Sequence, residues 1–401
     1  MTTSGRDHPK GYSRRQAIGL LATGAGLTLG AACRGGTNPD VTAGDSATPD
    51  AQAVTFPDGA IVRTILDDVA PNSLPDGATL FHEHLQLGFG YYTSPPVIGA
   101  GQRRSSAPTE ADTERFLDLI VDELHMAATD GMSCVVDAAI GRRSEREIEN
   151  LRQMASRSGM QVVVAGGYFR APYPSVLVEM TVDQMADHLA EDAQAQRWGA
   201  LGEIGTSMEM HPDERRFLRA VSQTHLRTGL PIFSHTDHEG CASCALEQLD
   251  IFESEGVDPA HLCIGHLSDI TLEEDAESRT HKAIAARGAF VGFDTVGRAL
   301  GMAPQGAPGK LPPSHEDIPE AVKVRRVLSV LDAGYEDYVL LSADFSSAVD
   351  LKANWGNGFS TTLVQFVPKL IHAGVDERTL HKILVDNPRR FLAFVPPPSV
   401  V

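Results

Sequence analysis

The stretch Thr-Leu-Phe-His-Glu-His-Leu at residues 79–85 places two histidines in one short apolar run. Successive side chains of an extended strand point to opposite faces, so His82 and His84 would share one face and Glu83 would point to the other. Two imidazoles about 7 Å apart along one face can bind a single metal ion. Two ordinary, partly buried histidines are the alternative, and the rest of the chain has to separate these interpretations.

Seven further apolar runs follow, and helix-like segments alternate with them. Some of the runs, such as Cys-Val-Val at 134–136 and Val-Val-Val at 162–164, lack solvent alternation, which indicates strands covered on both faces and therefore a parallel sheet. The predicted strands cover residues 78–84, 134–140, 162–168, 200–205, 231–235, 261–266, 290–295 and 339–344. The predicted helices cover residues 111–130, 144–158, 182–198, 212–228, 242–255, 272–287, 319–333, 361–373 and 377–386.

Repeated strand–helix units predict an α/β protein, and eight of them over roughly 340 residues predict a (β/α)8 TIM barrel with inserted loops. A doubly wound open sheet is the alternative, but it usually has a Gly-rich phosphate loop after its first strand, and this chain has none there. No break in composition divides residues 55–396, which we therefore predict to be one domain. The long gap between residues 84 and 134 is expected to hold an inserted first loop that forms a lid or substrate wall.

Residues 1–35 have the composition of an export signal. Arg14 and Arg15 precede a Gly-rich apolar run that is too short for a stable transmembrane helix, a pattern typical of a Tat signal peptide. Small residues before Cys33 resemble a lipoprotein cleavage site, although Leu29 lies one place too far upstream, so lipid anchoring and simple cleavage both stay open. Residues 36–54 are expected to form a flexible linker. The predicted location is therefore periplasmic, extracellular or lipid-anchored at the cell surface, with membrane contact only through the signal peptide or the anchor.

The net charge of −19 argues against a nucleic-acid partner, because anionic polymers would be repelled. Beyond Cys33 the chain has four cysteines. Cys134 and Cys263 lie in apolar runs and are predicted to be buried. Cys241 and Cys244 form a single C-x-x-C pair, which could form a disulfide after export or stay reduced.

Polar side chains recur at the C-terminal ends of the predicted strands, where TIM barrels place their catalytic groups. Each histidine alone could be an ordinary polar residue, but six ligand-type side chains at five strand ends argue against that for the whole set. Four imidazoles and two carboxylates would meet at one mouth, and they have the types and number needed for two divalent metals with a bridging carboxylate. These residues are His82, His84, Glu203, His235, His266 and Asp344.

Residues 77–392 resemble the phosphotriesterase family of the amidohydrolase superfamily. The matching motifs are Gly-Ala-Thr-Leu-Phe-His-Glu-His at 77–84, Gly-Glu-Ile-Gly-Thr-Ser at 202–207, Ser-His-Thr at 234–236, Ile-Phe-Glu-Ser-Glu-Gly-Val at 251–257, Ile-Gly-His-Leu-Ser-Asp at 264–269, Leu-Ser-Ala-Asp at 341–344 and Asn-Pro-Arg-Arg-Phe-Leu at 387–392.

The resemblance implies an enzyme with a binuclear metal site, with zinc as the first expectation and manganese, cobalt or iron as alternatives. The two ions would lower the pKa of a shared water and polarise a C=O or P=O oxygen of the substrate. Asp344 would act as the general base that accepts or orients the proton of the hydroxide. The ligands would divide into His82, His84 and Asp344 for the buried ion, His235 and His266 for the more exposed ion, and Glu203 as the bridge.

Two positions depart from the best-known members of the family. Those members carry a carbamylated lysine on the fourth strand, whereas this chain has Glu203, as one subgroup of the family does. After the seventh strand, the phosphotriesterases have Asp-His and the related lactonases have Asp-Arg, whereas this chain has Asp294-Thr295. Asp294 would keep a place on the substrate side, but the relay or lactone contact of the following residue is missing, which argues against phosphotriesters and acyl-lactones.

Other substrate contacts are suggested by position alone. Tyr168 and Phe169 end the third strand and could form an aromatic wall. Arg142, Arg143 and Arg170 follow the second and third strands and could bind a carboxylate or phosphate, with a surface salt bridge as the alternative for each.

The sequence therefore predicts an exported, metal-dependent hydrolase in which a metal-bound hydroxide attacks an ester, lactone, amide or phosphoester of a small-molecule substrate. The rival hypothesis is a non-catalytic metal- or solute-binding surface lipoprotein on the same barrel. Such a protein would need no base, so the presence of Asp344 beside four histidines argues against it. The sequence leaves open whether the chain forms a homodimer.

Overall fold

The computed structural model describes residues 54–86, 109–138, 141–237, 240–297, 318–346 and 348–397. The predicted signal peptide, almost all of the linker and residues 87–108 of the first loop lie outside these ranges, as do Ala139 and Ile140 at the end of the second predicted strand. In the described part of the chain, no helix combines the length and the apolar character needed to cross a membrane.

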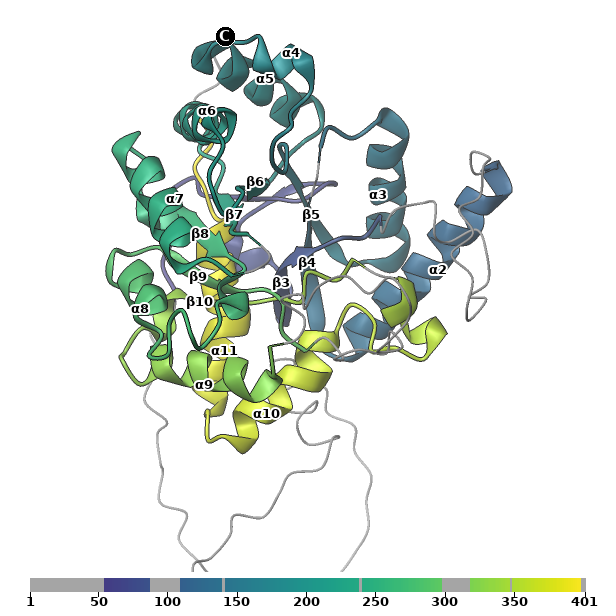
Figure 1. Ribbon diagram of the computed structural model, residues 1–401. Coiled ribbons are helices and arrows are strands. Elements are labelled where there is room, and N and C mark those ends of the chain that lie inside the picture. Colours follow the sequence, from purple (N-terminus) through teal and green to yellow (C-terminus); the bar gives the residue numbers. More distant parts are fainter. Residues whose placement is uncertain are drawn as a thin grey trace, which may run out of the picture.

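Eight parallel strands form the centre of the protein, and each pairs with its neighbour along the chain (Figure 1). A parallel bridge between Glu83 and Phe345 joins the first of these strands to the segment after the last. Across the same seam the amide of Asp344 donates to the carbonyl oxygen of His82 at 3.0 Å. The predicted TIM barrel is confirmed. Its strands are β3 Ala78–Glu83, β4 Met132–Asp137, β5 Gln161–Gly166, β6 Ala200–Gly205, β7 Ile232–His235, β8 Leu262–Gly265, β9 Phe290–Phe293 and β10 Val339–Leu341.

Helices surround the barrel, as Figure 1 shows. Capping boxes at Thr109, Ser144 and Thr181 begin α2, α3 and α5, because each hydroxyl accepts from a backbone amide three residues on. A short antiparallel pair, β1 Val62–Arg63 and β2 Asp68–Val69, precedes the barrel. The helices are α2 Glu110–Thr129, α3 Glu145–Ser158, α4 Ser175–Val178, α5 Val182–Ala195, α6 Pro212–Thr228, α7 Ala242–Ser254, α8 Arg279–Ala286, α9 Glu320–Leu331, α10 Val367–His372, α11 Glu377–His381 and α12 Asn387–Leu392.

The helix predicted for residues 272–287 is shorter than expected, because α8 begins only at Arg279. Arg326, which is buried, donates to the carbonyl oxygens of Ile270 at 2.6 Å and Asp275 at 2.9 Å, so these carbonyls belong to a loop instead of a helix. The carboxylate of Asp275 then accepts from the amides of Arg279 and Thr280, both at 2.9 Å, and so marks the start of the helix. The prediction was wrong here because a residue far along the chain decides the local conformation.

The apolar filling of the barrel ends where the histidines begin. The ring of Phe81 in β3 packs edge-on against Phe233 in β7, with centroids 6.1 Å apart, and against Phe391 in α12 at 6.3 Å. The imidazole of His82 lies 5.1 Å from the ring of Phe233. The imidazole of His82 therefore lies directly against the aromatic core of the barrel.

The four cysteines in the barrel domain comprise one disulfide-bonded pair and two buried free thiols. Cys241 and Cys244 form a disulfide at the start of α7, with Cα atoms 5.2 Å apart, which settles the alternative that the C-x-x-C pair left open. Cys134 and Cys263 are free and buried. Burial raises the pKa of the Cys134 thiol to about 12, so this side chain behaves as a small apolar residue.

Candidate metal centre

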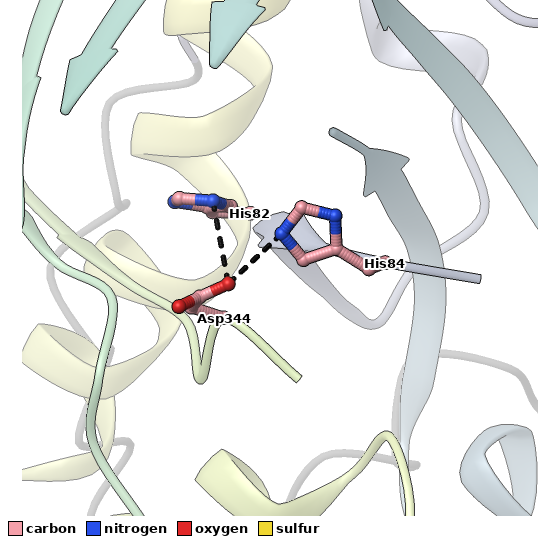
Figure 2. Close-up of side chains that lie close together, drawn as sticks. All are labelled: His82, His84 and Asp344. Atoms are coloured by element: carbon pink, nitrogen blue, oxygen red, sulfur yellow. Dashed lines mark ion pairs between the residues drawn. The ribbon is translucent and has the colours of Figure 1, made fainter. Parts of the chain in front are cut away.

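Three predicted ligands meet across the seam of the barrel, as Figure 2 shows. His82 lies in β3, His84 follows that strand directly, and Asp344 lies beyond β10. The Oδ1 atom of Asp344 is 2.9 Å from Nε2 of His84 and 3.6 Å from Nε2 of His82. The two imidazoles face the same mouth, with ring centres 5.5 Å apart, as the alternation of a strand predicts.

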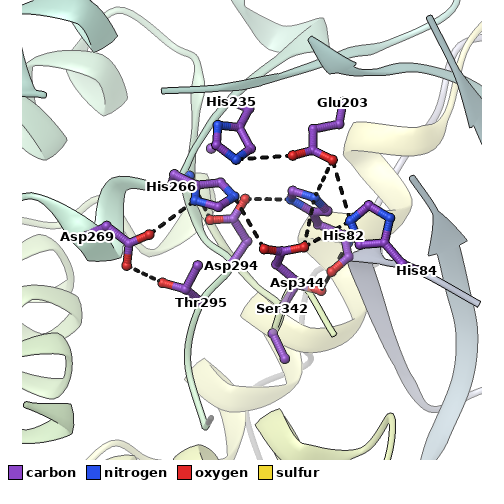
Figure 3. A network of polar contacts seen from close by, with 12 residues as sticks. His82, His84, Glu203, His235, His266, Asp269, Asp294, Thr295, Ser342 and Asp344 are labelled. Carbon is purple, nitrogen blue, oxygen red and sulfur yellow. Dashed lines mark hydrogen bonds and ion pairs between the residues drawn. The ribbon is translucent and has the colours of Figure 1, made fainter. Parts of the chain in front are cut away.

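Glu203 in β6 reaches histidines on both sides of the mouth (Figure 3). Its Oε2 atom is 3.5 Å from Nε2 of His82 and 3.4 Å from Nε2 of His84. Its Oε1 atom is 3.1 Å from Nε2 of His235. On the opposite side, Oδ2 of Asp344 is 3.8 Å from Nε2 of His266. One carboxylate thus faces both groups of imidazoles, which is the arrangement that a bridging ligand requires.

The donor atoms fit divalent metal ions. Nε2 of His82 and Oε2 of Glu203 are buried and form no hydrogen bond with any described residue, although a buried polar atom of this kind is costly unless something satisfies it. Two overlapping sets, His82 with His84 and Asp344, and His82 with Glu203 and His266, each bring their ligand atoms within 4.8 Å of one another. Imidazole and carboxylate are the ligands that zinc and similar ions take in catalytic sites.

The electrostatics of the mouth favour positive charge. Burial lowers the pKa of His82, but the carboxylates of Glu203 and Asp344 and the hydrogen bond to Asp294 raise it well above its usual value. For Glu203 the balance is opposite: burial raises its pKa, yet the imidazoles of His82 and His84 bring it below the usual value. The two carboxylates therefore attract cations to the space that the imidazoles surround.

Two of these residues sit in an unusual backbone conformation. His266 has a φ of +57° and Asp344 a φ of +47°, in the left-handed region that residues other than glycine rarely adopt. The amide of His266 is held by Oδ1 of Asp294 at 2.7 Å, and the amide of Asp344 by the carbonyl of His82. Such conformations cluster at functional sites, where the surrounding structure keeps them in place.

Asp294 lies behind the histidines and not in front of them. Its Oδ2 atom is 2.8 Å from Nδ1 of His82, and its side chain is fully buried (Figure 3). This contact leaves Nε2 of His82 turned toward Glu203 and Asp344. The sequence predicted a place for Asp294 on the substrate side; the structure places its carboxylate against the candidate ligand His82, where it can orient that imidazole.

A second buried carboxylate does the same for His266, and sequence reasoning did not single it out. Oδ2 of Asp269 is 3.1 Å from Nδ1 of His266, and its Oδ1 accepts from the hydroxyl of Thr295 at 2.5 Å. The ammonium group of Lys323 in α9 donates to the carbonyl oxygen of Thr295 at 2.6 Å and lies 3.7 Å from Asp269. Asp269 follows His266 by three residues, so this spacing was a usable signal, whereas nothing near Lys323 in the sequence points to the site.

Glu83, between the two histidines, stabilises the seam. It accepts hydrogen bonds from the hydroxyl of Ser342 at 2.7 Å and from the amides of Ala343 at 2.9 Å and Phe345 at 2.7 Å. Burial raises its pKa to about 7, against the lowering effect of these hydrogen bonds. The side chain therefore points away from the mouth, as the strand alternation predicts, and ties β3 to the loop that carries Asp344.

The two aromatic residues predicted to form a wall both line one cavity, but their rings pack against different neighbours. The ring of Phe169 is 4.8 Å from the imidazole of His235 and nearly perpendicular to it, so Phe169 borders the metal centre. The ring of Tyr168 packs edge-on against Phe217 of α6, at 6.0 Å, toward the helical layer. Of these two residues, Phe169 is therefore the one whose ring packs against a candidate ligand.

The three arginines that the sequence suggested as substrate contacts have different environments. Arg143 is buried, and its guanidinium bonds to Oδ2 of Asp137 at 2.6 Å and to the carbonyl of Ala138 at 2.9 Å, so it supports the end of β4. Arg142 and Arg170 have partly exposed side chains and line a cavity beside Phe169.

Comparison with known proteins matches this architecture to one family. The model of the phosphotriesterase family matches residues 61–392. N-acetyltaurine hydrolase from Mus musculus is 27% identical over 357 residues, which cover 83% of this chain and 98% of the relative. The Homo sapiens N-acetyltaurine hydrolase is 26% identical over 360 residues, with the same two coverages.

Solved structures agree with the match. A resiniferatoxin-binding protein from Rhodobacter sphaeroides is 29% identical with a TM-score of 0.65, and covers 83% of this chain and 95% of its own. The phosphotriesterase homology protein from Escherichia coli, complexed with phosphate in its active site, shares the fold with a TM-score of 0.62 at 24% identity, over 79% of this chain and 99% of its own. The family match spans the barrel from β1 to α12 and includes every ligand position described above, and the chain therefore belongs to the phosphotriesterase family of hydrolases.

Proposed function

We propose that this hydrolase binds two divalent metal ions, zinc first among them and manganese, cobalt or iron as alternatives, and cleaves an amide bond of a small molecule. The position of Glu203 carries the proposal, because its two oxygens face His82 and His84 on one side and His235 on the other. We further propose that the protein is exported by the Tat pathway, on the basis of Arg14 and Arg15.

The residues of the chain would share the work as follows. Bound metal ions supply an activated water and polarise the carbonyl oxygen of the substrate. Asp344 presents Oδ1 to His84 and Oδ2 to His266, so it stands between both ligand groups, where it can accept a proton as general base. Asp294 and Asp269 hold the Nδ1 atoms of His82 and His266, which keeps each Nε2 directed into the mouth.

Two observations favour an amide over a phosphotriester or a lactone. The curated relatives named N-acetyltaurine hydrolase match over 98% of their length, and that name describes an amide hydrolase. Thr295 occupies the position after Asp294 where the resemblance places His in phosphotriesterases and Arg in lactonases. Its side chain is fully buried and its hydroxyl bonds to Asp269, so it offers no group to a substrate. Esters, lactones and phosphoesters stay in the test as comparison substrates.

Metal content and turnover on a substrate panel test the proposal directly. The purified protein, freed of metal and reloaded with zinc, should bind two equivalents and hydrolyse N-acyl amides faster than esters, lactones or phosphotriesters. A loaded protein that turns over none of the four bond types would contradict a hydrolytic role.

One comparison favours a second candidate function. The relative from Rhodobacter sphaeroides, 29% identical, is named for binding resiniferatoxin, which keeps a solute-binding surface protein as the rival. A binder would take up metal and ligand without turnover, and Asp344→Asn would leave its ligand affinity unchanged. Loss of hydrolysis in that variant would instead favour the enzyme.

A further inference from the structure

A cavity of about 370 Å³ opens beyond the end of β5, and one of its lining residues, Phe169, also contacts the candidate ligand His235. Its lining includes Arg142, Phe169, Arg170 and Tyr173. None of these residues is a candidate metal ligand, and the cavity contains two of the three arginines that the sequence suggested for a carboxylate or phosphate.

Phe169 is a wall that the cavity shares with the metal centre. One contact of its ring is the imidazole of His235, at 4.8 Å. The ring also lies against the guanidinium of Arg170, whose central carbon is 5.2 Å from the ring centre. The ring is packed in place, since a Cβ atom on Gly205 would come within 2.6 Å of it. A single fixed aromatic ring therefore separates a cationic group from a candidate metal ligand.

Each of the two arginines is held by one carboxylate and keeps other hydrogen-bond donors of its guanidinium available. Arg170 uses Nη1 to bind Oδ2 of Asp237 at 3.0 Å, and Arg142 uses Nε to bind Oδ1 of Asp192 at 2.9 Å. A guanidinium has five N–H donors, and the remaining nitrogens of these two make no hydrogen bond with the described residues. Each carboxylate fixes the position of its arginine and leaves part of the donor fork available, and such a fork matches the oxygens of a carboxylate or sulfonate.

Tyr173 adds a neutral donor to the same lining. Its hydroxyl is buried and has no hydrogen-bond partner among the described residues. A buried hydroxyl without a partner is costly, and an oxyanion in the cavity would be a suitable acceptor.

We propose that this cavity is the subsite for an anionic group, a carboxylate or sulfonate, carried by the amine portion of the substrate a few bonds from the scissile amide. This inference rests on the proposed amide hydrolase and narrows its substrate class to N-acyl derivatives of amino acids or aminosulfonates. Arg170 is the main specificity residue because it lies against Phe169, and Arg142 is the outer one.

Equilibrium binding tests the subsite without any need for turnover. The probes are 2-aminoethanesulfonate and 2-aminoethanol, which have the same chain length but differ in the anionic group, titrated calorimetrically into the zinc-loaded full-length protein. Because a charge-assisted hydrogen bond is worth about 1.5–3 kcal/mol, the sulfonate should bind at least about tenfold more tightly than the alcohol. Arg170→Gln should remove most of that preference, and Arg142→Gln a smaller part of it.

Arg219→Gln is the matched control. Arg219 is also an exposed arginine held by one carboxylate, with Nε 2.6 Å from Glu255, but it lies on the helical layer in α6. The control should keep the wild-type preference for the sulfonate. If the wild-type protein binds the sulfonate no better than the alcohol, or does not bind it at all, the proposal is overturned. Retention of the preference in folded Arg170→Gln and Arg142→Gln would overturn it as well.

The failure of this inference differs from the failure of the proposed function. A wild-type enzyme that hydrolyses a neutral N-acyl amide but shows no preference for the anionic probe would lose the subsite and keep the hydrolase. A zinc-loaded protein that binds the sulfonate through Arg170 but hydrolyses nothing would keep the subsite and lose the hydrolase.

Discussion

The carboxylate of Asp294 lies 2.8 Å from Nδ1 of His82, and both side chains are fully buried within the barrel. The opposite ring nitrogen, Nε2, is thereby directed toward Glu203 and Asp344. A carboxylate behind a ligating imidazole selects the tautomer that leaves Nε2 without a proton and makes that nitrogen more basic.

Asp294→Asn should therefore weaken metal binding without unfolding the protein. An amide of the same size can still bond to His82 and to the amide of His266, but it can present its NH2 group to Nδ1 and favour the wrong tautomer. We expect zinc affinity to fall by about 10- to 100-fold, measured by competition with a chelator. An unchanged affinity in a folded variant would mean that Asp294 does not orient the ligand.

Glu203→Gln should lose at least one of two metal ions. A neutral amide bridges two cations poorly, and the carboxylate that it replaces faces imidazoles on both sides of the mouth. The number of zinc ions per chain, measured by elemental analysis, should fall from two, and the wild type should show no dependence on added bicarbonate. One zinc in the fully loaded wild type would defeat the binuclear centre and leave a mononuclear hydrolase.

Asp344→Asn should keep the fold but lose turnover by orders of magnitude. Residue 344 has a φ of +47°, and asparagine is among the few residues that adopt this region readily, so the backbone is not disturbed. An amide oxygen can still ligate a metal, but it cannot accept a proton. Near-normal kcat on whichever substrate is found would remove Asp344 from the mechanism.

Lys323→Met should destabilise the barrel. Lys323 is 3% exposed, and its removal would take a cation away from the buried carboxylate of Asp269 and leave the Thr295 carbonyl without the lysine as its donor. Breaking a buried pair in this way costs about 3–5 kcal/mol of unfolding free energy, which urea denaturation can measure. Lys282→Met is the control, because the side chain of Lys282 in α8 makes only an exposed hydrogen bond to a backbone carbonyl among the described residues, and it should change the free energy by about 0.5 kcal/mol or less. Equal effects of the two substitutions would contradict a structural role for the Lys323 network.

Export can be tested apart from catalysis. Tat recognition reads both guanidinium groups of the twin arginine, so changing Arg14 and Arg15 together to lysine should leave the protein in the cytoplasm. Cell fractionation and immunoblotting would locate it. Normal export of the double variant would rule out the Tat pathway. That result would not bear on the proposed metal centre.

The barrel could be predicted because its signals are local. Apolar runs such as 134–136 and 162–164 indicate strands covered on both faces, and their regular alternation with helices leaves few topologies. The ends of such strands meet at one mouth, so residue type at each end was enough to propose His82, His235 and the other ligands as neighbours. The structure brings these side chains together, and the distances between them could not be predicted from the sequence.

Other features depend on residues that are distant along the chain, and only the tertiary structure decides them. The carboxylate of Asp294 bonds to the imidazole of His82, 212 residues away, a contact that the sequence did not indicate. Arg326 bonds to the carbonyls of Ile270 and Asp275, in the loop that replaces the first part of the helix predicted for residues 272–287. In the sequence nothing distinguishes Arg143 from a surface arginine, but in the structure its guanidinium bonds to the carbonyl groups at the end of β4. The sequence specifies which kinds of group a side chain can bond to. The direction in which the side chain points depends on the partners that the fold brings within about 3 Å, because hydrogen bonds and ion pairs weaken steeply beyond that distance.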